Sequence, residues 1–265
     1  MSKSKTRIFQ TETKQLLKLM IHSLYSNKEI FIRELVSNAS DAIDKLRFKS
    51  IQNKSLGEKI KDPNINVKVL KNDKQIIISD NGIGMSEEEI IENIGTIARS
   101  GTAKFLENIS GDKQKDSNLI GQFGVGFYSV FMVAEKVQVI SKSANEKSDK
   151  AIMWESNGEE KYKLKEVTKE NFGTDVIIYL NEENAEFAEE GRVKYLLQKY
   201  SQYINFPLNL ISDENNSIRI NDADALWLKP KRSIKDQEYI DFYKFISFDQ
   251  EDPLLWIHNK VEGKN

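Results

Sequence analysis

Apolar residues recur every three or four positions along several segments of the chain, and this is the spacing of one helix face. The first segment runs from Gln10 to Tyr25, and the second runs from about Lys28 to Ser50. Phe187–Tyr203 and, near the end, Ser233–Ser247 show the same period. The pattern therefore predicts a helix in each of these four segments, with one apolar side turned toward a core.

Alternation of apolar and polar residues, which is typical of half-buried strands, occupies the regions between these helices. Residues 64–70 read NINVKVL and residues 75–79 read QIIIS, so the turn 71–74 between them predicts a β-hairpin. Ser86 followed by three glutamates has the capping-box pattern that opens a short helix. Further strands are predicted at Lys136–Ser141, Ala151–Ser156, Tyr162–Val167, Thr174–Leu180 and Leu208–Ile211.

This order of elements predicts an α/β fold, in the form of an α+β two-layer sandwich. Helices are expected to cover one face of a mixed, largely antiparallel sheet. Residues 1–212 are expected to form this domain, and the polar stretch 213–224 is expected to be a short linker. Residues 225–265 are interpreted as the start of an incomplete second domain, because about 40 residues are marginal for burying a core alone.

The composition narrows the chemistry that the chain can perform. It contains no cysteine, which excludes disulfides, zinc–thiolate sites, iron–sulfur clusters and thiol nucleophiles. Its only histidines are His22 and His258, so a histidine-rich metal site is not expected. A net charge of −2 gives no overall attraction to nucleic acid or to an anionic membrane. With no secretory signal and no long apolar span, the sequence predicts a cytoplasmic protein.

Three stretches carry polar groups that suit a nucleotide. In the first, Glu34, Asn38 and Asp41 lie at i, i+4 and i+7 and therefore share one helix face. An amide oxygen suits a magnesium ion bound to phosphate, and a neighbouring carboxylate can polarise water. The plainer interpretation is a solvated polar face on an amphipathic helix, and this helix alone does not exclude it.

The second stretch is ISDNGIGM, in which an apolar strand runs directly into Asp80. Gly82 and Gly84 allow backbone conformations that other residues avoid, so a flat ligand could approach the main chain. The carboxylate could accept a hydrogen bond from an exocyclic amine such as that of adenine. An ordinary Asn-Gly hairpin turn is the alternative.

The third stretch is GQFGVGFYS, with glycines at positions 121, 124 and 126. This spacing is neither the dinucleotide-binding order nor a P-loop. Successive glycine N–H groups can nevertheless surround one anion, and a predicted helix at Phe127–Ala134 would add its N-terminus. A flexible loop that closes over the core is the alternative.

The runs EIFIRELVSNASDAIDK (Glu29–Lys45), DNGIGM, IGTIARSGT and GQFGVGFYS together resemble the ninety-kilodalton heat-shock chaperone family, in its bacterial branch. The resemblance extends over essentially the whole chain, including DPLLWIHNKVEGK near the end. It implies the left-handed ATP-binding fold that these chaperones share with gyrase B subunits, mismatch-repair ATPases and sensor histidine kinases. It also implies an ATPase that assists protein folding.

The resemblance also implies roles for single residues. Glu34 would activate the attacking water, Asn38 would bind magnesium and phosphates, and Asp80 would accept the adenine amine. The base pocket would include Gly84 and Met85, and Thr174 would share the adenine contact through water. The remaining expected contacts with sugar and phosphates come from Asn93, Arg99, Gly121, Gly124, Val125, Gly126 and Phe127.

Two departures from the family qualify these roles. Arg99 stands where the family usually has lysine, so a planar fork replaces a point charge at a phosphate contact. Residues from about Ile94 to Gly124 would form a lid over bound ATP.

The second departure is that the sequence stops just inside the second domain. In the family, the middle domain supplies an arginine to the γ-phosphate, and the C-terminal domain forms a homodimer. Without that arginine, we expect these 265 residues to bind ATP and ADP well but to hydrolyse ATP slowly.

Three functions from different classes are compatible with these patterns. The first is a chaperone ATPase that acts on unfolded client proteins, with ATP closing the lid and driving N-terminal association. The second is a kinase-like relative, which would need an accepting histidine; His22, within a predicted helix, is a poor candidate. The third is a nucleotide sensor without turnover. Hydrolysis separates the first from the third, and a stable phosphoryl label would favour the second.

Overall fold

The fold is built around one large sheet with helices on one of its faces. The computed structural model describes residues 27–57, 60, 62–97, 102, 124–214, 216–221, 226, 229–247 and 249–259. Eight strands form a single sheet in the order β5-β4-β3-β6-β2-β1-β7-β8. All neighbouring strands are antiparallel except β1 and β7, which are parallel. The predicted α/β sandwich with a mixed, largely antiparallel sheet is therefore confirmed.

The strands agree closely with the predicted alternation. The predicted hairpin is present, with a turn at residues 71–74. Along β1 every second residue is buried, as expected for a sheet with one covered face. The strand bounds are β1 Ile65–Leu70, β2 Gln75–Asp80, β3 Ala134–Lys142, β4 Lys150–Ser156, β5 Tyr162–Thr168, β6 Gly173–Leu180, β7 Leu208–Ile211 and β8 Ser217–Arg219. Strand β8 lies within residues 213–224, the segment expected to be a linker.

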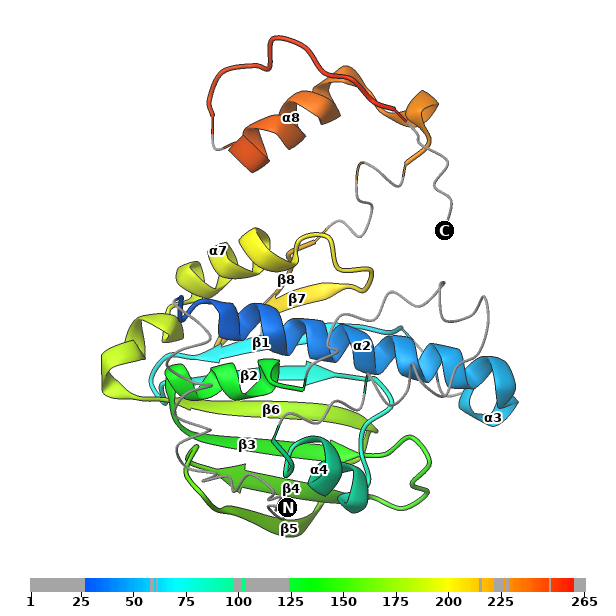
Figure 1. Cartoon of the computed structure of the whole chain (residues 1–265), viewed down its shortest axis with the longest axis vertical. Coiled ribbons are helices and arrows are strands. Elements are labelled where there is room, and N and C mark those ends of the chain that lie inside the picture. Colours follow the sequence, from blue (N-terminus) through cyan, green and yellow to red (C-terminus); the bar gives the residue numbers. More distant parts are fainter. Residues whose placement is uncertain are drawn as a thin grey trace, which may run out of the picture.

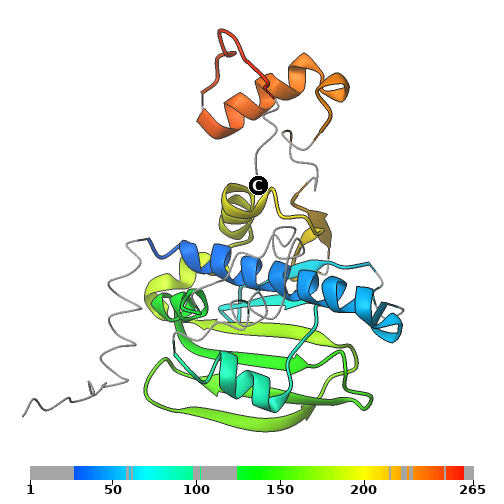
Figure 2. The same ribbon diagram turned by 45° about the vertical axis from the view of Figure 1, so that its right-hand side comes forward.

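Helix α2 (Ile30–Gln52) crosses one face of the sheet, and α4 (Glu87–Asn93) lies on the same face (Figures 1 and 2). The apolar side of α2 is fully buried at Phe31, Ile32 and Ile43, where it packs against the strands. Short helix α3 (Lys54–Gly57) follows α2. The predicted capping box of α4 is present, because Ser86 accepts from the Glu89 N–H and Glu89 accepts from the Ser86 N–H.

The structure corrects the predicted helix at Phe127–Ala134. Gly126–Met132 forms a short 3₁₀ helix, η1, and strand β3 already begins at Ala134. The Ser129 hydroxyl donates to the Gly126 carbonyl at 2.6 Å, which is the acceptor that the first α-helical turn would use. Such a local side-chain bond competes with regular α-helix.

The predicted helix Phe187–Tyr203 is divided in two. Residues Glu182–Ala188 form the 3₁₀ helix η2, and α7 begins only at Glu190 and ends at Ser201. Between them Glu189 is extended, with ψ 125°, so the helix cannot continue through it. The predicted helix at residues 10–25 lies outside the described residues.

The last described elements are η4 (Lys231–Ser233) and α8 (Asp236–Ser247), which stand apart from the sheet in Figure 1. Tyr203, just after α7, makes ring contacts with Phe242 and Phe245 of α8, each with centroids 6.2 Å apart. None of the described helices has the length and apolar character that a membrane crossing requires.

Candidate functional site

A cavity of about 810 Å³ lies beside helix α2, above the middle of the sheet. Its lining includes residues from all three stretches that the sequence singled out. From α2 come Glu34 and Asn38, and from the turn after β2 come Asp80, Gly84 and Met85. The others are Asn93, Gly124, Val125, Gly126, Phe127 and Thr174. Two predicted site residues, Arg99 and Gly121, lie outside the described residues, as does most of the predicted lid.

Asp80, the last residue of β2, provides a carboxylate at the floor of the cavity. Its Oδ1 accepts a hydrogen bond from the Gly82 N–H at 2.8 Å. Burial raises the pKa of the Asp80 carboxyl to about 7, although N–H bonds from Gly82 and Thr174 act in the opposite direction. The apolar side chains of Ile78 and Val176 line the cavity nearby. A carboxyl group in such surroundings is suited to accept from a neutral donor on a flat, largely apolar ligand.

Ser141 supports this corner and was not identified from the sequence. Strand pairing places Thr174 opposite both Asp80 and Ser141, so all three positions share one sheet face. The two hydroxyl oxygens of Ser141 and Thr174 are 2.8 Å apart, and Ser141 Oγ also accepts from the Met85 N–H at 2.9 Å. Cross-strand register was the missing information, since nothing local marks Ser141.

The turn at Gly84 is held against the neighbouring strand more closely than a side chain would permit. Gly84 has φ +60°, and a Cβ built there would lie 1.9 Å from the Lys142 carbonyl oxygen. Only glycine satisfies both conditions without strain. The backbone can therefore turn sharply after Asp80 and pack directly against the carbonyl of Lys142.

We expect Gly84→Ala to lower the free energy of unfolding by at least about 2 kcal/mol, from left-handed strain together with overpacking. Urea unfolding followed by circular dichroism measures this. Gly191→Ala is the matched control, because it lies in helix α7 with open space around it and alanine favours helix. A Gly84→Ala protein as stable as the control would contradict this account of the turn.

Glu34 lies against the glycine-rich stretch. A Cβ built on Gly126 would be 2.2 Å from Glu34 Oε2, so the carboxylate lies close against the backbone of this glycine. The other oxygen, Oε1, accepts from the Arg33 guanidinium. Asn38, one helical turn further on, also lines the cavity, and no described residue is seen to hydrogen-bond its amide. The structure thus brings a carboxylate, an amide and a glycine backbone to one end of the cavity.

Phe127, which lines the cavity, belongs to a cluster of aromatic side chains. Its ring packs edge-on against Trp154, with centroids 5.7 Å apart, in an aromatic cluster below the glycine stretch. The adjacent Tyr128 donates to the Ile94 carbonyl at 2.6 Å, and burial raises the pKa of this phenol to about 12. The backbone at residues 124–127 is therefore anchored from beneath by aromatic side chains.

A second set of polar contacts extends from Asp41, which the sequence placed on the candidate helix face, to Lys45 and Thr102, which it did not identify. Lys45 Nζ donates to Thr102 Oγ1 at 2.7 Å, and Thr102 Oγ1 donates to Asp41 Oδ2 at 3.2 Å. Burial lowers the pKa of Lys45, which lines the cavity. The spacing Asn38, Asp41, Lys45 marks one helix face, and extending the predicted face by one turn would have identified the lysine.

Comparisons with known proteins define the class. Residues 25–183 match the family model described as histidine kinase-, DNA gyrase B-, and HSP90-like ATPase, and residues 212–265 match the one described as Hsp90 protein. The chain therefore belongs to the family of histidine kinase-, gyrase B- and HSP90-like ATPases.

Within this class, the predicted resemblance to the bacterial branch of the heat-shock chaperones is confirmed. Proteins named chaperone protein HtpG are similar to the chain over nearly all of its length. The one from Aliivibrio fischeri (strain ES114) is 51% identical over 269 residues, covering 98% of this chain and 43% of that protein. The one from Sulfurovum sp. (strain NBC37-1) is 52% identical, covering 97% and 44%. The one from Shigella dysenteriae serotype 1 (strain Sd197) is 50% identical, covering 100% and 43%. The chain thus spans less than half the length of these relatives.

Proposed function

We propose that this chain binds ATP in the cavity beside α2 and hydrolyses it slowly, as the ATPase part of a protein-folding chaperone. The observation that carries the proposal is that Asp80, Glu34, Asn38 and residues 124–127 line one cavity, although they come from separate parts of the chain. The name chaperone protein, carried by the relatives, supports the wider role.

At the base end, the Asp80 carboxylate accepts the adenine amine. Thr174, which is hydrogen-bonded to Ser141, shares this contact through a water molecule. Gly84 and Met85, which line the cavity, flank the edge of the base. The buried carboxyl supplies specificity, because an unmatched donor or acceptor there would stay unpaired.

At the phosphate end, the backbone N–H groups of residues 124–127 and the predicted contacts at Asn93, Arg99 and Gly121 hold the phosphates. Magnesium fits here only together with the nucleotide, because no group of three or more acidic or histidine side chains in the described residues can hold a metal. Asn38 would supply one oxygen ligand, and phosphates and water would supply the others. The ion would neutralise phosphate charge.

Glu34 accepts a proton from the attacking water as general base. Slow turnover is part of the proposal, since one oxygen of this carboxylate is already bonded to Arg33. The ion pair holds the side chain beside Gly126, but it also competes with water for Oε1. The full positioning of the γ-phosphate would then need groups outside the described residues.

Calorimetric titration with ADP and with ATP, both with Mg²⁺, tests the proposal directly. We expect one nucleotide per chain, together with slow release of inorganic phosphate from ATP. Absence of binding would contradict it. Incubation with γ-labelled ATP distinguishes the kinase-like alternative, which requires stable label on the protein. His22, the residue weighed for that role, lies outside the described residues.

The raised pKa of Asp80 predicts a pH dependence of binding. The ionised carboxylate is the better acceptor, and it is the minority form at pH 6 but the majority form at pH 8. Adenosine, which has no phosphate to titrate, should therefore bind roughly tenfold more weakly at pH 6 than at pH 8. Binding constants measured at both values check this. An affinity that does not change would mean that Asp80 does not meet the base.

The raised pKa of Asp80 affects the stability of the nucleotide-free protein in the opposite direction: its contribution to the free energy of unfolding decreases as the pH rises. Because the folded-state pKa lies above the unfolded value of 3.8, the folded chain binds more protons between the two values. The contribution of Asp80 to the free energy of unfolding is therefore largest below that window and falls as the pH rises toward 7.

The wider role extends beyond these 265 residues. We propose that the whole protein is cytoplasmic, acts on unfolded or partly folded client proteins and forms a homodimer. In it, ATP would favour N-terminal association. We expect neither nucleic acid nor membrane as partners. The match of residues 212–265 to the Hsp90 protein family supports the interpretation that residues 225–265 begin a middle domain.

A further inference from the structure

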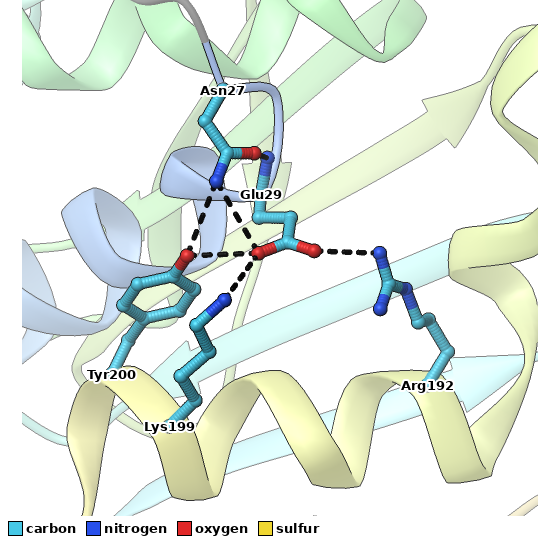
Figure 3. A network of polar contacts seen from close by, with 5 residues as sticks. All are labelled: Asn27, Glu29, Arg192, Lys199 and Tyr200. Carbon is cyan, nitrogen blue, oxygen red and sulfur yellow. Dashed lines mark hydrogen bonds and ion pairs between the residues drawn. The ribbon is translucent and has the colours of Figure 1, made fainter. Parts of the chain in front are cut away.

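The carboxylate of Glu29, the residue just before α2, joins the start of this helix to one face of α7 (Figure 3). Its Oε1 accepts from Arg192 at 2.6 Å. Its Oε2 accepts from Lys199 at 3.0 Å and from the Tyr200 hydroxyl at 2.8 Å. Asn27 completes the group, because its Nδ2 donates to Tyr200 and its Oδ1 accepts from the Glu29 N–H at 3.0 Å.

This group differs from an ordinary surface ion pair. The Glu29 side chain is only 15% exposed, and both of its oxygens are bonded. Burial acts to raise its pKa, but hydrogen bonds from Lys199, Tyr200 and Asn27 outweigh it and bring the pKa to about 2. Arg192, Lys199 and Tyr200 lie at i, i+7 and i+8 of α7 and therefore on one face. The charge is fixed in one geometry rather than held by a single mobile partner.

Glu29 also does not cap the helix, as the side chain of an N-cap residue usually does. It occupies the N-cap of α2, yet its side chain makes no cap hydrogen bond. The carboxylate is directed at α7 instead, as Figure 3 shows. Its effect is thus to fix the first turn of α2 against a helix some 160 to 170 residues further along the chain.

The partners of Glu29 on α7 connect it to the candidate nucleotide site. Glu34 lies five residues further along α2, which is a rise of about 7.5 Å. Lys199 and Tyr200 line the same cavity as Glu34. Just after α7, Tyr203 contacts Phe242 and Phe245 of α8. Glu29 is therefore placed between the turn that carries Glu34 and the helix that leads toward the C-terminal unit.

We propose that Glu29 is a positioning residue for ATP hydrolysis, which holds the first turn of α2 against α7 and so keeps Glu34 in place beside Gly126. The inference rests on the proposed function. Its physical basis is that Glu29 immediately precedes the helix that carries Glu34, so a shift of the first turn of α2 would move the Glu34 carboxylate relative to the backbone of Gly126 beside it. A displacement of about 1 Å at a reacting group can cost about a hundredfold in rate.

Nucleotide affinity should depend little on Glu29. The groups that would hold the adenine, Asp80, Thr174 and Met85, lie on the sheet and the turn after β2. In the described part of the chain, the hydrogen bonds and ion pairs of Glu29 join it to Asn27, Arg192, Lys199 and Tyr200 and to none of these groups. A positioning role therefore predicts that the rate of the chemical step falls while the ADP dissociation constant is kept.

Glu29→Gln tests this, with single-turnover ATP hydrolysis and calorimetric ADP titration as the two measurements. Glutamine keeps the shape but removes the charge that binds Arg192 and Lys199. We expect the hydrolysis rate to fall about tenfold or more, and the ADP dissociation constant to stay within about threefold. Both are measured well below the melting temperature, so that the variant is fully folded.

Two controls separate positioning from stability. Val193→Ala removes a fully buried side chain from α7 but leaves the Glu29 contacts intact, so it should lower the melting temperature with little change in rate. Glu182→Gln removes an exposed ion pair with Lys74 and should change neither quantity.

A Glu29→Gln protein that hydrolyses ATP within twofold of the wild type would overturn the inference. So would a rate loss that Val193→Ala reproduces at the same melting temperature. If the wild-type chain itself fails to bind ADP, the proposed function fails and the inference fails with it. The binding titration on the unaltered protein identifies that case.

Discussion

Asp80→Asn is expected to weaken ATP binding by about 2–4 kcal/mol, which corresponds to roughly 30- to 1000-fold in the dissociation constant. Asparagine keeps the shape of the side chain, and its carbonyl can still accept from the Gly82 N–H. Its amide group, however, would place a donor opposite the donor of the adenine amine. Titration calorimetry with ATP and Mg²⁺ measures the loss.

The fold should tolerate this change. Burial raises the pKa of Asp80 to about 7, so an uncharged amide relieves an unfavourable buried charge at neutral and higher pH. The melting temperature is therefore expected to be unchanged or higher, and a loss of binding cannot be attributed to unfolding. Asp73→Asn is a matched control, because Asp73 is exposed in the turn between β1 and β2 and does not line the cavity. Equal affinities of the Asp80→Asn and wild-type proteins would show that the base lies elsewhere.

Glu34→Ala is expected to reduce ATP hydrolysis by about 10²- to 10⁴-fold while ADP binding survives. The change removes the proposed general base but not the groups at the base end of the cavity, and the space it leaves adjoins Gly126. Phosphate release from ATP, measured with excess protein, gives the rate.

Glu88→Ala serves as a control for the loss of a carboxylate. Glu88 is exposed on helix α4 and does not line the cavity, so its replacement should leave the rate within twofold. A Glu34→Ala protein that retains more than about a tenth of the wild-type rate would exclude Glu34 as the base. If neither the wild type nor the variant shows measurable turnover, the sensor interpretation is favoured.

Local patterns predicted the elements well where one physical preference dominates. The hairpin β1–β2 follows from strict alternation and a four-residue polar turn, and α4 follows from its capping box. At residues 126–132 two preferences compete. The apolar run indicated a helix, but the bond from Ser129 to Gly126 favours a 3₁₀ turn that no periodicity reveals.

The residues of the candidate site also fall into two groups: those that local motifs predict and those that only the fold reveals. Asp80, Glu34 and Asn38 were identifiable because their residue types occur in local motifs with unusual glycines or spacing. Ser141 was not, because its role depends on strand register with Thr174. Glu29 lies within a family motif, but its role could not be predicted from the sequence, because its partners on α7 come together with it only in the folded chain.

A crystal structure of the chain with ADP and Mg²⁺ tests the central claim most directly. The account predicts the adenine amine within hydrogen-bond distance of the Asp80 carboxylate, the Asn38 amide oxygen on the magnesium, and the phosphates against the backbone of residues 124–127. A nucleotide bound with its base away from Asp80, or bound outside the cavity beside α2, would contradict it.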